Sequence, residues 1–170
     1  DAEIANPKKS EKAATWINRA KICSDAIIAP TKGLFAGLDE GMLAVSVGTQ
    51  PSEVKDGVYE FERIKVHTKG GKVLAWSIKS EVLPNAYQIA TEALKKAYEM
   101  DQAAAPKIKE ALNVLINHYS ELGSTSIDIT EYKSAIDAYL KAVELQQNPA
   151  IGKADPRYYF FAGQLAAFLG

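Results

Sequence analysis

The stretch "KSAIDAYLKAVELQ", residues 133–146, decides the fold because its pattern occurs twice in the chain. An earlier stretch, "IATEALKKAYEMDQ" at residues 89–102, follows the same pattern at an offset of 45 positions. When residues 87–100 are laid against 132–145, six of fourteen positions are identical. The identical pairs are Tyr87/Tyr132, Ala90/Ala135, Ala93/Ala138, Lys96/Lys141, Ala97/Ala142 and Glu99/Glu144. The match indicates two copies of one helical unit rather than two unrelated amphipathic helices.

The segments around these two stretches also carry apolar residues at helical spacing. We predict helices over residues 8–28, 85–102, 105–122 and 130–147, and a fifth from Asp155-Pro156 to the end of the chain. Pro84 stands before the second helix, and Asn148-Pro149 ends the fourth. Gly123 is expected to cap the third helix at its C-terminal end.

The alanine spacing resembles that of the tetratricopeptide-repeat (TPR) family, whose second helix carries Ala, a bulky residue four positions later and Ala three further on. Ala90-Leu94-Ala97 and Ala135-Tyr139-Ala142 fit this pattern. The first helix of a family repeat carries an aromatic residue, a Leu-Gly or Ala-like pair and then Tyr. Tyr159-x2-Ala162-Gly163-x2-Ala166 fits that pattern better than Trp16-x2-Arg19-Ala20-x2-Cys23 or Ile108-x2-Ala111-Leu112-x2-Leu115. Small residues at these positions let two helices approach to roughly 8–10 Å.

The resemblance implies a mainly α fold, a right-handed α-solenoid of about two and a half helix pairs that bury their faces by stacking on one another. We expect residues 1–170 to form a single TPR-like domain that is a piece of a longer repeat array. A family repeat has about 34 residues. We therefore assign the eleven surplus residues of the period seen here to an extended first helix and to a loop at 123–128.

Residues 29–84 are too long for a connection within a helix pair, so they are predicted to form an insert. Within it, "YEFERIKVHTKGGKVLAWSIKSE" at 59–81 alternates β-branched and aromatic residues with polar ones around Gly70-Gly71. This alternation predicts a β-hairpin at about 58–80. In the stretch 34–48, a short helix over 34–45 is favoured over a strand.

Two registers of the hairpin can be compared. A two-residue Gly-Gly turn sets Val66 opposite Ala75 and mixes apolar with polar side chains on each face. A three-residue loop that begins at Lys69 sets Val66 opposite Leu74 and Ile64 opposite Trp76, which gives one apolar face. We predict the second register, with Ile64, Val66, Leu74, Trp76 and Ile78 packed on the helices.

Composition and charge argue against several classes of protein. Apolar residues make up 47% of the chain, charged residues 24%, and the formal net charge is −1, with no basic tract that would bind nucleic acid. No apolar run reaches the roughly 20 residues of a membrane-spanning helix. His67 and His118 have no carboxylate or cysteine at ligand spacing, and Cys23 lies on an apolar stripe. We therefore predict no metal, no cofactor and no catalytic residue.

The resemblance places the binding surface in the concave groove of the helical stack, where known TPR proteins seat peptides. Lys109, Asn113 and Asn117 recur every four residues and so lie along one line beside the apolar stripe. A Lys with an Asn one turn later resembles part of the clamp by which some TPR domains hold the terminal carboxylate of a peptide. Lys21 and Arg157 are the candidates for the rest of the clamp. A solvated polar flank is the alternative interpretation.

The sequence thus predicts a non-enzymatic protein–protein interaction scaffold whose partner is a protein or a peptide. The alternative function is a receptor for a peptide or small ligand that uses the groove together with the hairpin insert. We expect Tyr159, Phe160 and Phe168 of the last helix to be covered by an oligomer partner or by further repeats. Asp1 in place of Met, with the resemblance to exported bacterial TPR proteins, favours an extracytoplasmic location, periplasmic or outer-membrane associated, over a cytoplasmic one.

Overall fold

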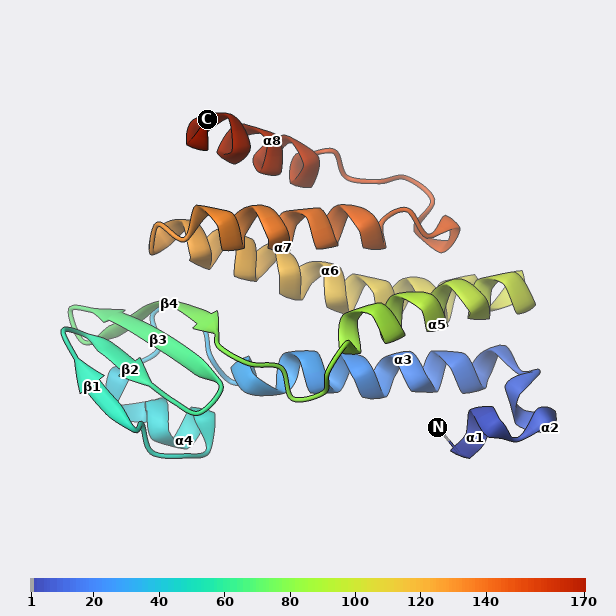
Figure 1. Cartoon of the computed structure of the whole chain (residues 1–170), viewed down its shortest axis with the longest axis horizontal. Helices are drawn as coiled ribbons and strands as arrows, with labels where there is room; N and C mark the ends of the chain where they lie inside the picture. Colours follow the sequence, from blue (N-terminus) through green and yellow to red (C-terminus); the bar gives the residue numbers. More distant parts are fainter. Residues whose placement is uncertain (1) are drawn as a thin grey trace.

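The chain is mainly helical and carries a small four-stranded antiparallel sheet at one end (Figure 1). The computed structural model describes residues 2–170, apart from the side chain of Glu3. The helices are α1 (Ala2–Ala5), α2 (Pro7–Ser10), α3 (Ala13–Ile28), α4 (Leu43–Val47), α5 (Ala86–Met100), α6 (Ala105–Asp128), α7 (Tyr132–Leu145) and α8 (Arg157–Leu169). The strands are β1 (Glu53–Lys55), β2 (Val58–Glu60), β3 (Ile64–Lys69) and β4 (Lys72–Ile78).

The long helices pack in pairs. Helix α3 packs against α5, α6 packs against α7, and α8 lies on α7 (Figure 1). Alanines stand at the contacts, and Ala20, Ala90 and Ala97 are fully buried. A side chain ending at Cβ lets the helix backbones come close, as the sequence pattern required. The pairs are joined by Tyr87 of α5, whose hydroxyl donates to Glu144 Oε2 of α7 at 2.7 Å.

Helices α5, α7 and α8 begin and end within two residues of the predicted bounds. Residues 8–28 differ, because α2 and α3 are separate helices with a break at 11–12. The indole N–H of Trp16 donates to the carbonyl of Ser10 at 2.8 Å. That carbonyl would accept the backbone N–H of Ala14 if α2 continued, so the indole replaces a helical hydrogen bond at the break.

The prediction that Gly123 caps a helix is wrong, as is the predicted loop at 123–128. Helix α6 runs through both and ends at Asp128. Two residues later, Thr130 adopts a left-handed φ of 61°. Gly123 is buried, and a Cβ added there would lie 2.7 Å from Cε1 of Tyr139 in α7. Gly123 is therefore present because α6 and α7 approach each other closely, and the surplus residues of the repeat extend the helix itself.

The insert is larger than a hairpin: β1 and β2 join β3 and β4 in one sheet of order β1-β2-β3-β4. The prediction that its apolar face packs on the long helices is wrong for most of that face. Ile64, Val66 and Trp76 are buried in a second, smaller core that is closed by the preceding segment of the insert, through Leu34, Leu38 and Leu43. Leu122 of α6 also packs against this core.

The predicted register of the hairpin, with a three-residue loop that begins at Lys69, is wrong at the turn and beyond it. The two-residue alternative holds at the turn only. The turn is Gly70-Gly71, both at positive φ, with Lys69 paired to Lys72. The register then shifts between His67 and Thr68, so that Leu74 is an extra residue, and Val66 stands opposite Trp76. A β-bulge of this kind restores one apolar face without a longer loop.

The short helix predicted at 34–45 is present only in its second half. Residues 40–42 form one 3₁₀ turn and α4 follows at Leu43–Val47, ending at Gly48 with a left-handed φ of 83°. The residues before it pair with the hairpin instead, since Val73 exchanges backbone hydrogen bonds with Gly37 and Leu38, both at 2.8 Å. This pairing covers the first half of the outer edge of β4.

Candidate binding sites

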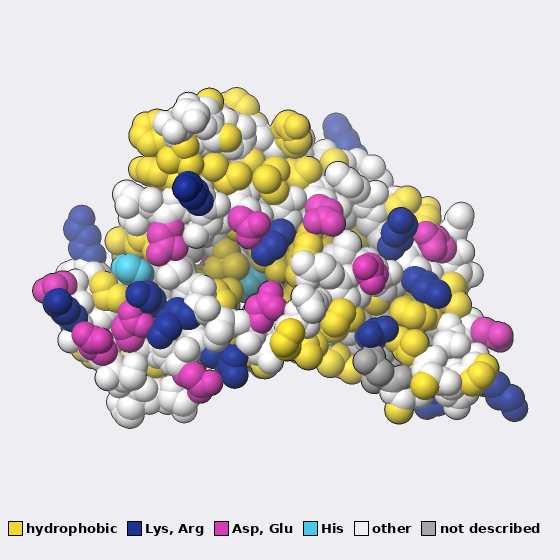
Figure 2. Space-filling view, in the orientation of Figure 1, with side chains coloured by type: hydrophobic (Ala, Val, Ile, Leu, Met, Phe, Trp, Pro, Cys, Tyr) yellow, Lys and Arg dark blue, Asp and Glu magenta, His cyan; other side chains and the backbone are white. Residues whose placement is uncertain are grey.

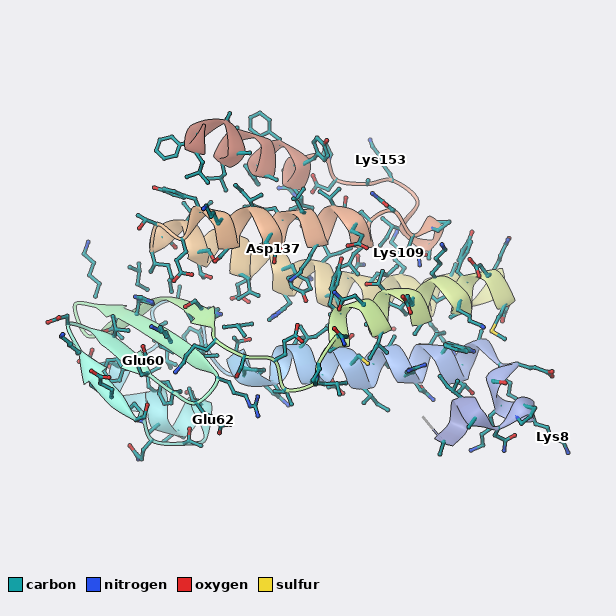
Figure 3. All side chains as sticks on the ribbon, viewed as in Figure 1. Lys8, Glu60, Glu62, Lys109, Asp137 and Lys153 are labelled. Carbon is teal, nitrogen blue, oxygen red and sulfur yellow. The ribbon has the colours of Figure 1, made fainter. Side chains whose placement is uncertain are left out.

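The five predicted binding residues are spread over three helices. Lys109, Asn113 and Asn117 are exposed and follow one line of α6, as predicted (Figure 3 labels Lys109). Lys21 of α3 lines a shallow hollow of about 530 Å³ against the first turns of α6. Arg157 opens α8 and forms an ion pair with Asp155, with 2.6 Å between Nη2 and Oδ2, which lowers the pKa of that carboxyl.

Helix α8 carries a large uncovered apolar surface. Its Ala162 is buried against α7, and Phe161 tilts against the ring of Tyr139 with centroids 5.4 Å apart. On the rest of the helix, Tyr159, Phe160 and Phe168 are 68%, 58% and 72% exposed. Figure 2 shows the hydrophobic side chains gathered over this helix. We call Tyr159, Phe160, Gly163 and Ala166 together the α8 face.

A second candidate site is a hollow of about 510 Å³ between the end of β4, the residues that link it to α5, and helices α3, α6 and α7. We call it the junction hollow. Figure 2 shows it on the near face, with charged side chains around its opening. Its apolar lining includes Ile27, Ile78, Leu83, Tyr119 and Leu122. No sequence spacing links these residues, because the insert brings them together in space.

The rim of the junction hollow carries balanced charge. Three lysines, Lys79, Lys133 and Lys141, stand with three carboxylates, Glu81, Glu131 and Asp137. Lys141 Nζ lies 2.9 Å from Asp137 Oδ2, and Lys79 Nζ lies 2.8 Å from Glu60 Oε2 of the sheet (Figure 3 labels Asp137 and Glu60). The balance disfavours a simple anion or cation as the ligand.

His118 of α6 lines the same hollow and is only 7% exposed. Among the described residues, no group forms a hydrogen bond with its Nε2 atom. Burial, with a smaller contribution from Lys141, lowers the pKa of His118 to about 4, so the ring is neutral at pH 7. A buried imidazole nitrogen without a partner is costly. In the sequence, His118 has no carboxylate or cysteine at ligand spacing, so the residue pattern gave no signal of this site.

The described residues contain no group of three or more His, Cys, Asp or Glu that could hold a metal ion. Cys23 is buried in the main core, which raises the pKa of its thiol. Within the same part of the chain, every helix is too short or too polar to cross a bilayer. Comparisons with models of protein families, with curated proteins and with solved structures find no match to the chain.

Proposed function

We propose that the chain is a non-enzymatic protein–protein interaction scaffold of the TPR type, and that the α8 face is where it receives a partner. The single observation that carries the proposal is the exposure of α8 at positions that are buried in the other two first helices. In this assignment α3, α6 and α8 are the first helices of successive repeats, and α5 and α7 are the second helices that cover α3 and α6.

Equivalent positions of the first-helix pattern support this proposal. Ala20 of α3 and Leu112 of α6 are 0% and 1% exposed in the core that α5 and α7 close. Gly163 of α8 takes the same place in the pattern, yet it is exposed, and a Cβ added there would meet nothing within 4 Å. At the next position of the pattern, Cys23 and Leu115 are buried, whereas Ala166 of α8 is exposed.

The partner that fits the α8 face is an amphipathic helix with alanines on its contact side. Gly163 and Ala166 leave a flat surface on which such a helix can approach closely, and Tyr159 and Phe160 supply large apolar area beside it. Helix α5 packs on α3 in the same way, with Ala90 and Ala97 fully buried. A large exposed apolar surface of this kind is characteristic of an interaction site.

The test is affinity purification from the native host with the 170-residue chain as bait, repeated with two variants. Phe160→Glu places a charge on the α8 face and should lower retention of the partner at least about tenfold. Val45→Glu is the matched control, because Val45 is 73% exposed on α4, away from α8. It should leave retention unchanged, and circular dichroism should show that both variants are folded.

The proposal is contradicted if both variants lose partner retention equally, or if Phe160→Glu retains the partner as well as the unaltered chain. Loss confined to the triple variant Lys109→Ala, Asn113→Ala, Asn117→Ala would place the partner on α6 and would also contradict it. Sedimentation of the purified chain identifies the source of the helix, since a dimer that Phe160→Glu dissociates shows that a second copy supplies it.

A further inference from the structure

We infer that the junction hollow binds an extended peptide segment, which adds to the free edge of the sheet at Ile78 and places one apolar side chain against Leu122. This site lies in a different part of the molecule from the α8 face and shares no residue with it. The two proposals therefore stand or fail separately.

The edge of the sheet beside the hollow is open. Strand β4 is the last in the order β1-β2-β3-β4, and it is the strand next to α6 (Figure 1). Its first half is covered by the hydrogen bonds of Val73 with Gly37 and Leu38. Its second half ends at Ile78, which lines the hollow. An uncovered strand edge is the usual place at which an extended peptide adds to a sheet.

The ladder shows which backbone groups point toward that edge. Lys79 donates its N–H to the carbonyl of Arg63 at 2.7 Å, so this pair is of the hydrogen-bonded type. Hydrogen-bonded and non-hydrogen-bonded residue pairs alternate along an antiparallel ladder. The neighbouring pair, Ile64 and Ile78, is therefore of the non-hydrogen-bonded type. The N–H and the carbonyl of Ile78 therefore point away from β3. Over residues 2–170, no protein group pairs with either of them.

The lining of the hollow suits one side chain and the backbone of such a peptide. A volume of about 510 Å³ lies within the range of ligand pockets. Ile27, Leu83 and Leu122 provide apolar contact, and the unpaired N–H and carbonyl of Ile78 provide the polar groups. A peptide backbone is neutral and carries both donors and acceptors, which matches these two groups and a rim of balanced charge.

The test uses a library of N-acetylated, C-amidated heptapeptides in which the central residue is varied over apolar and polar side chains. We expect saturable binding by calorimetry for peptides with a bulky apolar centre. Hydrogen exchange of the Ile78 amide should slow when the chain is saturated with such a peptide. Methylation of the peptide nitrogen that pairs with Ile78 should weaken binding about tenfold, the value of one hydrogen bond.

Three variants test the location. Leu83→Ala should weaken peptide binding about fivefold, because apolar contact with the peptide side chain is lost. Val54→Ala is the matched control, since Val54 of β1 is an exposed apolar residue that does not line the hollow. Ser134→Trp places a large ring at the exposed rim and should abolish binding without disturbing the core.

The inference is overturned if no peptide of the library binds more tightly than about 1 mM. It is equally overturned if binding leaves the exchange of the Ile78 amide unchanged, or if Ser134→Trp binds peptide as well as the unaltered chain. An equal effect of Leu83→Ala and Val54→Ala would show that the hollow does not hold the peptide.

Discussion

Substituting Gly123 by Ala tests how closely α6 and α7 approach each other. In an exposed helix, Gly to Ala stabilises by roughly 0.5–1 kcal/mol, because Ala has less backbone freedom to lose. At Gly123 the added methyl would lie 2.7 Å from Cε1 and 2.8 Å from Cζ of Tyr139. These are ring atoms rather than the flexible end of a side chain. Tyr139 is only 5% exposed, and its ring stacks on that of Tyr158 with centroids 6.4 Å apart.

Overpacking a well-packed core typically costs about 1–3 kcal/mol. The helical gain offsets part of this, and we expect Gly123→Ala to lower the free energy of unfolding by about 1–2 kcal/mol. For a chain of this size that corresponds to a fall in Tm of about 2–8 °C. Gly163→Ala is the matched control, because a Cβ there meets nothing within 4 Å, and it should raise Tm by about 1–4 °C.

The assay is thermal unfolding followed by circular dichroism, together with a double-mutant cycle. In a Tyr139→Leu background the ring is absent, so Gly123→Ala should become neutral or stabilising. If Gly123→Ala raises Tm as much as Gly163→Ala does, the reasoning about this contact is refuted. An unchanged effect of Gly123→Ala in the Tyr139→Leu background would refute it as well.

Two further predictions concern the buried histidine and the small core of the insert. Between about pH 6.5 and pH 4 the unfolded chain binds a proton at His118 that the folded chain does not, so acidification through this window should lower the free energy of unfolding, by on the order of 3 kcal/mol. Urea titrations at several pH values measure this loss; His118→Phe should largely remove it, and an unchanged pH dependence in that variant contradicts the prediction. Trp76→Ala removes the largest side chain of the insert core and should cost about 3–5 kcal/mol there, so amides of β3 and β4 should exchange faster while those around Leu112 in α6 keep their protection. A uniform loss of protection in both regions would show that the two cores unfold as one.

The alanine spacing predicted the helix contacts because it reflects packing directly. Ala90 and Ala97 of α5, and Ala135 and Ala142 of α7, are all 0% exposed. A helix that must approach a neighbour closely needs small residues at fixed intervals, and that requirement is visible in the sequence without knowledge of the neighbour. The bounds of α5, α7 and α8 followed from the same periodicity and from the prolines beside them.

The features that escaped prediction depend on contacts between distant segments. Gly123 has the sequence signal of a helix cap, but the ring of Tyr139 determines its role. The predicted hairpin register and its alternative both assumed a regular ladder, whereas the extra residue Leu74 allows the short turn and the apolar face together. The junction hollow combines residues of the insert with residues of three helices, such as His118, and no spacing along the chain relates them.

The second core has a consequence for how the chain folds. Helix α3 can pair with α5 only after residues 29–85 have been brought into a closed loop. A flexible segment of that length would make the pairing slow, because loop closure costs entropy before any contact forms. The sheet and α4 have apolar contacts of their own, so the segment can become compact first and hold the end of α3 near the start of α5. The folded insert would then shorten the time that α3 needs to find α5.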